Sequence, residues 1–270
     1  MRNRFHEHGR RTTILFLIWL ASTASGLGAS SATRDLSEFF GGREGCFVRY
    51  DAQKDAYLRF NPQGCAKRFS PCSTFKIANT LIALDTGLVS GPEFSLKWDG
   101  TKRPIASWNQ DHTLRSAIQF SVVWFFQEVA RRIGPEHMAD YVRRFDYGNG
   151  DISGGITNFW LSSSLRISAD EQVGFLRRLW ADQLPVSKEA QRLTRELIEL
   201  SRSADGRVFY GKTGAAGDPK ADIATLGWFV GCVSKGECRY FFATRITGDK
   251  DASGRQARQI TEAILAKLQI

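Results

Sequence analysis

Strand-like segments occur near both ends of this chain, and helical patterns fill its middle. Short runs of apolar and aromatic residues between turn residues predict strands over residues 47–50, 56–60, 208–210, 226–233 and 239–246. Apolar residues at helical spacing predict helices over residues 73–84, 116–133, 135–145, 168–182, 188–201 and 256–268. A sheet drawn from both ends of a chain with helices between them is the α+β pattern. We therefore expect one antiparallel sheet flanked by helices, with a mainly helical region beside it.

The first residues have the features of a secretory signal peptide. A basic leader contains Arg2, Arg4, Arg10 and Arg11, an apolar run covers residues 12–21, and small residues follow over 24–32. The apolar run is too short to span a bilayer comfortably, although an N-terminal anchor is the alternative. We expect residues 1–32 to be removed, with cleavage somewhere between 26 and 32, and residues 33–270 to form a single catalytic domain. The mature protein is then periplasmic or secreted and has no stable membrane association.

The charge balance limits the kind of partner. The 270-residue chain has 37 Lys and Arg against 28 Asp and Glu, a formal net charge of +9, and it stays basic without the leader. A moderate positive charge favours a small anionic ligand, while basic and aromatic residues do not alternate as in nucleic-acid-binding proteins. After the leader only His112 and His137 remain, and there is no CxxC motif. We therefore expect neither a nucleic-acid partner nor a metal.

Export to an oxidising compartment would favour disulfides among the five cysteines. The most plausible pairs join cysteines in or beside strands that are predicted to be neighbours, and the fifth thiol would stay free. We expect the pairs Cys46–Cys65 and Cys232–Cys238, with Cys72 left over.

Three short strings carry the chemistry: Ser73-Thr74-Phe75-Lys76, Ser121-Val122-Val123 and Lys212-Thr213-Gly214. If Ser73 opens a helix, Lys76 lies one turn further on the same face, so its amine can approach the serine hydroxyl. An exposed lysine, with a pKa near 10.4, is protonated and cannot accept a proton at neutral pH. Burial among the nearby apolar residues would lower that pKa. A neutral Lys76 would then be a base itself or would add carbon dioxide to become a carbamate. These residues predict an acyltransferase or hydrolase with a lysine-activated serine.

Together with Tyr147-Gly148-Asn149, these strings occur in the order found in the class D serine β-lactamases, the oxacillinase family, which the chain resembles from about Leu36 to Leu268. Phe159-Trp160-Leu161 and Trp108 ahead of Thr113-Leu114-Arg115 are also similar to that family. The resemblance implies a serine β-lactamase fold like that of the penicillin-binding transpeptidases. It also implies hydrolysis of β-lactam antibiotics, and hence a role in resistance.

The resemblance also assigns roles. Ser73 would be the nucleophile and Lys76 the N-carboxylated general base, held by the indole N–H of Trp160 in a dry pocket formed by Phe75, Val123 and Leu161. Carbon dioxide on Lys76 would be the only added group. Ser121 would pass a proton to the leaving nitrogen with the support of Lys212. The backbone N–H groups of Ser73 and Ala215 would bind the oxyanion.

Substrate binding is expected of Trp108, Thr213, Gly214 and Ala215. Either Arg255 or Arg258 would bind the substrate carboxylate, and Arg258 is the preferred candidate because it lies closer to the apolar helix pattern. Tyr147 and Asn149 are either catalytic or architectural. Two other functions stay open, namely a β-lactam sensor that is acylated and stops, and a peptidoglycan-processing penicillin-binding protein. The oligomeric state, monomer or homodimer, and the range of β-lactams that are accepted also stay open.

Overall fold

The computed structural model describes Met1 and residues 29–218, 223–236, 238–248 and 251–270. Almost all of the expected leader, including its basic and apolar parts, lies outside these residues. Ser30–Thr33, which overlaps the window predicted for cleavage, forms the first strand of the sheet. Among the described residues, no helix combines the length and apolar character needed to cross a bilayer.

The sheet has seven strands in the order β1-β3-β2-β9-β8-β7-β6. They are β1 (Ser30–Thr33), β2 (Glu44–Asp51), β3 (Ala56–Phe60), β6 (Glu199–Arg202), β7 (Arg207–Asp218), β8 (Ile223–Lys235) and β9 (Cys238–Thr247). All neighbours are antiparallel except β1 and β3, so the sheet is mixed at one edge. Strands from the two ends of the chain meet where β2 pairs with β9. The expected α+β fold is confirmed.

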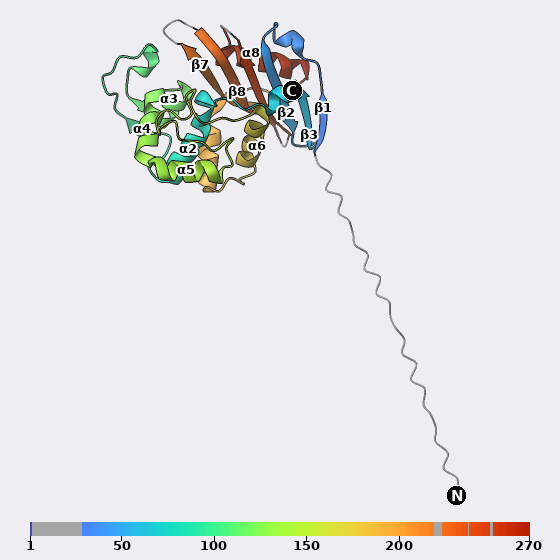
Figure 1. Ribbon diagram of the computed structural model, residues 1–270, viewed down its shortest axis with the longest axis horizontal. Coiled ribbons are helices and arrows are strands. Elements are labelled where there is room, and N and C mark those ends of the chain that lie inside the picture. The colour runs from blue at the N-terminus through green and yellow to red at the C-terminus, as the bar shows by residue number, and fades with distance from the viewer. Residues whose placement is uncertain (2–28, 219–222, 237, 249–250) are drawn as a thin grey trace.

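Eight α-helices accompany the sheet in the described part of the chain (Figure 1). They are α1 (Pro62–Ala66), α2 (Lys76–Asp85), α3 (Leu114–Gln119), α4 (Val123–Ile133), α5 (Pro135–Arg144), α6 (Ala169–Trp180), α7 (Lys188–Leu197) and α8 (Gly254–Lys267). Short 3-10 helices occur at Ser37–Phe39, Cys72–Phe75 and Ala106–Trp108, and β4 (Ser95–Leu96) pairs with β5 (His112–Thr113).

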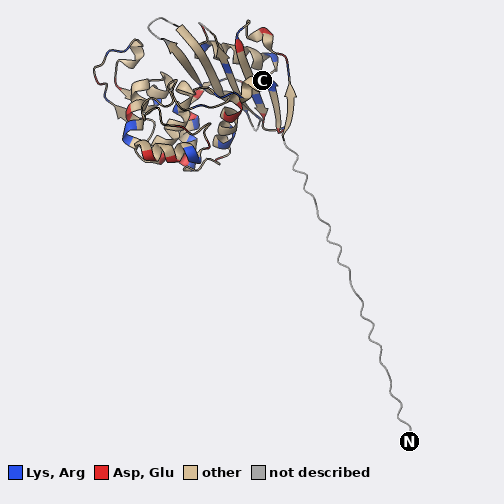
Figure 2. Ribbon diagram, viewed as in Figure 1, with Lys and Arg blue, Asp and Glu red and all other residues tan. Residues whose placement is uncertain are grey.

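The sheet is covered on both faces. Helix α8 packs on β8 and β9. Helix α6 packs on β2 and β9 and lies beside the helical region that contains α2. The middle of β8 is therefore buried continuously, as expected for a strand with helices on both faces. Helices α4 and α5 have charged residues of both signs on their exposed faces (Figure 2). Some of these residues form ion pairs, such as Arg132–Glu128 and Arg144–Asp140.

Helix starts follow local signals where the sequence offers a cap. The sequence Ser168-Ala169-Asp170-Glu171 has the capping-box pattern and forms one, because the Ser168 side chain accepts from the Glu171 N–H and the Glu171 side chain accepts from the Ser168 N–H. The helix predicted over 116–133 is instead two helices, α3 and α4. They are separated by Ser121, which has a left-handed φ of +56° that an α-helix cannot continue through.

Two further helix predictions were wrong in part. Residues 199–201 belong to strand β6 rather than to the helix predicted over 188–201, because they pair with the edge of β7. Ser73 lies in the 3-10 helix Cys72–Phe75, and α2 begins only at Lys76.

The two expected disulfides are not formed, since Cys46, Cys65, Cys72 and Cys232 are all buried free thiols. Cys46 on β2 and Cys65 in α1 lie close enough for their thiols to hydrogen-bond, but no S–S bond joins them. The tight β8–β9 turn places Cys232 opposite Phe241 and Cys238 opposite Lys235, so the two cysteines are out of register.

Candidate active site

The first string, Ser73 to Lys76, lies where the 3-10 helix Cys72–Phe75 runs into α2. Lys76 Nζ lies 2.7 Å from Ser73 Oγ, and Lys76 is completely buried. Burial lowers the pKa of the Lys76 amine far below its usual value, and the positive charge of Lys212 lowers it further. The expected approach of the lysine to the serine is therefore present, with an amine biased to the neutral form that a base requires.

The second pair joins residues that are distant in the sequence. Lys212 Nζ lies 3.0 Å from Ser121 Oγ and 3.1 Å from the carbonyl oxygen of Thr213. Ser121 occupies the left-handed turn between α3 and α4, and Lys212 is on β7. Burial lowers the pKa of Lys212 to about 8. A lysine and a serine held this way can pass a proton.

Strand β7 approaches the nucleophile closely because residue 214 is glycine. A Cβ atom on Gly214 would lie 2.9 Å from the carbonyl oxygen of Pro71 and 3.2 Å from the backbone nitrogen of Thr74. Gly254, at the start of α8, is equally tight, because its Cβ would lie 2.9 Å from the carbonyl oxygen of Gly214. Glycine at these two positions lets β7 fit between the nucleophile turn and α8.

A cavity of about 650 Å³ opens onto Ser73 and Ser121. Thr213, Gly214 and Ala215 form one wall and Arg255 stands at its edge. Several apolar side chains line the rest: Ile105, Trp108, Phe120, Val123, Leu161 and Ile223. Ile105, Phe120, Ser162, Ile223 and Gly254 lack any local sequence signal for this role, because their places depend on how separate loops meet.

The structure separates the two candidate arginines. Arg255 lines the cavity that contains Ser73. Arg258, the preferred candidate from the sequence, lines a neighbouring cavity that Lys212 and Thr213 also line, and it pairs with Glu262 at 2.7 Å.

Trp160 is fully buried, and its ring stacks on that of Phe75 with a 5.7 Å separation of centroids. Its indole N–H has no hydrogen-bond partner among the described residues. Buried N–H groups are rarely left unpaired, so this group fits an acceptor that the chain does not itself supply.

The Tyr147-Gly148-Asn149 string supports the neighbouring loop. Tyr147 is buried, and its ring packs edge-on against Phe75. A Cβ on Gly148, where φ is +62°, would lie 1.9 Å from the carbonyl oxygen of Arg166. The Asn149 side chain donates to the carbonyl of Ser164 and accepts from the N–H of Arg166. These contacts favour the architectural role.

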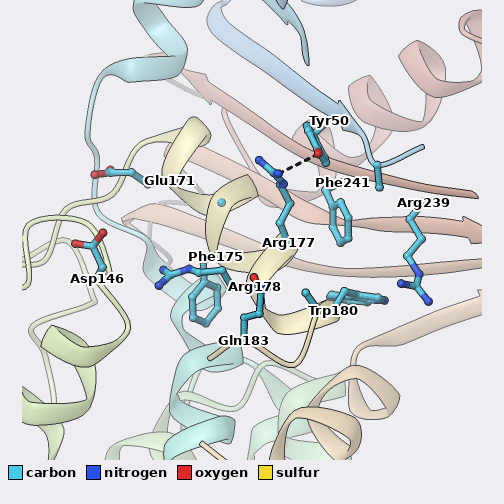
Figure 3. A pocket seen from close by; sticks show the side chains of 13 residues that line it. Tyr50, Asp146, Glu171, Phe175, Arg177, Arg178, Trp180, Gln183, Arg239 and Phe241 are labelled. Carbon is cyan, nitrogen blue, oxygen red and sulfur yellow. Dashed lines mark hydrogen bonds between the residues drawn. The ribbon is translucent and has the colours of Figure 1, made fainter. Parts of the chain in front are cut away.

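Another cavity, of about 680 Å³, lies between α6 and strands β2 and β9 (Figure 3). There Arg177 stacks on the ring of Tyr50 at 3.6 Å and donates to its hydroxyl group. None of the motif serines and lysines lines it. The volume of a cavity therefore does not identify the candidate active site. The Ser73–Lys76 and Ser121–Lys212 pairs identify it.

Comparison with known proteins agrees with this geometry. The penicillin-binding protein transpeptidase domain family matches residues 43–266. The chain is 37% identical to β-lactamase OXA-1 of Escherichia coli in an alignment of 279 positions that covers 99% of this chain and 96% of that protein. The structure of class D β-lactamase BAT-2 matches with a TM-score of 0.81 and 40% identity, covering 87% of this chain and 96% of that one. The C-terminal domain of the Bacillus licheniformis BlaR penicillin-receptor matches with a TM-score of 0.84 and 34% identity, covering 89% and 97%.

The chain therefore belongs to the penicillin-binding protein transpeptidase domain family, whose model spans most of its length. Its agreement in sequence with OXA-1 and in fold with BAT-2 makes it, more narrowly, a class D serine β-lactamase.

Proposed function

We propose that this enzyme hydrolyses β-lactams through an acyl-enzyme on Ser73, with a carboxylated Lys76 as the general base for acylation and deacylation. The observation that carries this proposal is the buried Lys76 amine, 2.7 Å from the Ser73 hydroxyl. Its lowered pKa leaves the nitrogen lone pair free to add to carbon dioxide with loss of one proton. When carboxylated, Lys76 supplies an anionic oxygen base beside the serine.

The other site residues have separate roles in this proposal. Phe75, Val123 and Leu161 exclude water from Lys76, and the unpaired Trp160 N–H donates to its carboxylate. Ser121 protonates the leaving lactam nitrogen and is resupplied through Lys212, which lies 3.0 Å away. The backbone N–H groups of Ser73 and Ala215 stabilise the oxyanion, for which one such donor is typically worth about 10²–10³ in rate.

Binding of the substrate uses charge at one end of the cavity and apolar surface at the other. Arg255, which is exposed at the cavity edge, attracts the substrate carboxylate together with Lys212 and Thr213. Trp108 and the other apolar side chains of the rim pack against the rest of the molecule. The protein acts in the periplasm or outside the cell, after loss of its leader.

A sensor that is acylated and not hydrolysed is the second candidate, favoured by the fold agreement with the BlaR penicillin-receptor domain. Purified protein mixed with a simple penicillin separates the two. A hydrolase consumes many equivalents, and mass spectrometry finds no lasting adduct on Ser73. One equivalent consumed, with a stable adduct on Ser73, would identify a sensor and overturn the proposed hydrolysis.

A further inference from the structure

Ser70, three residues before the nucleophile, is buried with 1% of its surface exposed. Its hydroxyl group donates to the carbonyl of Trp160 at 2.9 Å and accepts from the N–H of Ser162 at 2.9 Å. One side chain thus bridges the backbone on both sides of Leu161. None of the sequence motifs includes it.

The bridged segment is a sharp turn that needs support. Ser162 has a φ of +56°, in the left-handed region that residues other than glycine seldom occupy. Leu161 and Ser162 line the cavity that contains Ser73, and Trp160, which directly precedes them in the chain, carries the unpaired indole N–H. The path of this backbone therefore decides where the indole N–H lies.

The main chain of Ser70 ties the same junction to the sheet. Its carbonyl accepts a hydrogen bond of 2.9 Å from the indole N–H of Trp228 on β8. Trp228 in turn stands opposite Gly214 of the Lys-Thr-Gly strand. Ser70 thus connects the Trp160 loop, the nucleophile turn and the sheet in one place.

We propose that Ser70 is a positioning residue, whose hydroxyl group aims the Trp160 indole N–H and thereby sets the affinity of Lys76 for carbon dioxide. This inference rests on the proposed carboxylation of Lys76. Without the hydroxyl, the Trp160 carbonyl and the Ser162 N–H lose their bridge in a buried setting, where unmet hydrogen bonds are costly. The loop would then turn to find other partners and carry the indole with it.

Ser70→Thr and Ser70→Val form a matched pair for the test, because they have the same shape and differ only in the hydroxyl group. Titration with ¹³C-labelled bicarbonate, followed by ¹³C NMR of the lysine carbamate, measures carboxylation directly and without substrate. We expect Ser70→Val to need at least about tenfold more bicarbonate than wild type, as for other residues that orient an active-site ligand. Ser70→Thr should stay within about threefold of wild type.

Thr261→Val is the control for simple loss of a buried hydroxyl group. Thr261 pairs with Thr244 at 2.5 Å and with the carbonyl of Ala257 at 2.8 Å, between α8 and β9. This variant should lower thermal stability and leave the bicarbonate requirement unchanged.

The outcomes separate the two proposals. Equal bicarbonate requirements for Ser70→Thr and Ser70→Val would overturn the role of Ser70, while the carboxylation of Lys76 would stand. A wild-type protein with no carbamate signal at any bicarbonate concentration would overturn the carboxylation itself. If Ser70→Val does not fold, Ser70→Ala replaces it in the same titration, with Ser70→Thr still as the comparison.

Discussion

Lys76 Nζ lies 2.7 Å from Ser73 Oγ, across one turn of chain in which the 3-10 helix of the nucleophile becomes helix α2. One short segment therefore carries both the proposed nucleophile and its proposed base. The low pKa of Lys76 follows from its complete burial and from the charge of Lys212.

Replacement of Lys76 by alanine should lower kcat by at least about 10³-fold, because a general base is worth about 10²–10⁴ in a step and two steps use this one. Hydrolysis of a chromogenic cephalosporin measures the loss, and binding of the β-lactam should survive. Lys97→Ala, at an exposed ion pair with Asp111, is the control and should keep full activity. Steady turnover by Lys76→Ala would contradict the assignment of the base.

Activity should fall at acid pH and return when bicarbonate is added. Protonation of a lysine carbamate releases carbon dioxide, and a protonated amine cannot take it up again. Added bicarbonate shifts the equilibrium back, so kcat measured near pH 5 should rise with bicarbonate concentration. An enzyme that is indifferent to bicarbonate at low pH would indicate that Lys76 acts as a plain amine.

On the alkaline side, kcat/KM should fall as the pH rises through about 8, the pKa to which burial lowers Lys212. Above that pH the free enzyme loses the Lys212 charge that attracts the substrate carboxylate. Lys212→Arg stays charged throughout, so the alkaline limb of its kcat/KM profile should move to higher pH even if its overall activity is lower. An unchanged alkaline limb in Lys212→Arg would show that another group titrates.

Arg255→Ala should raise KM for penicillins by about tenfold, equivalent to about 1.4 kcal/mol, with little change in kcat. A remote contact made equally in ground and transition states has this effect. Arg258→Ala is the matched control, because Arg258 pairs with Glu262 and does not line the cavity that contains Ser73. A larger rise in KM for Arg258→Ala than for Arg255→Ala would reverse our assignment.

Gly214→Ala should reduce activity by at least about tenfold, as small displacements of active-site groups do. The new Cβ would meet the Pro71 carbonyl oxygen at 2.9 Å and push β7 away from the nucleophile turn. Gly174→Ala in helix α6 is the control, because its Cβ has nothing within 4 Å. It should keep full activity and gain up to about 1 kcal/mol of stability from helix propensity.

Much of the fold could be predicted because local pattern and tertiary context agree. The short apolar run at residues 56–60 and the capping box at Ser168 mark elements that form in the structure. The prediction failed where long-range pairing overrides the local pattern. Residues 199–201 continue a helical pattern but join the edge of β7, and the cysteines of β8 and β9 are neighbours in sequence but out of register.

The sequence by itself singled out the residues to which we assign the chemistry, because the serine, lysine and glycine strings occur in the order found in the class D enzymes. Only the tertiary structure decided how they meet. Ser121 and Lys212 are 91 positions apart and come within 3.0 Å because β7 packs against the turn between α3 and α4. The same packing turns Arg255, rather than Arg258, toward the cavity and sets Ser70 under the Trp160 loop. A local sequence pattern indicates which residues are buried and where the chain turns. The register of distant segments is set by packing across the whole core.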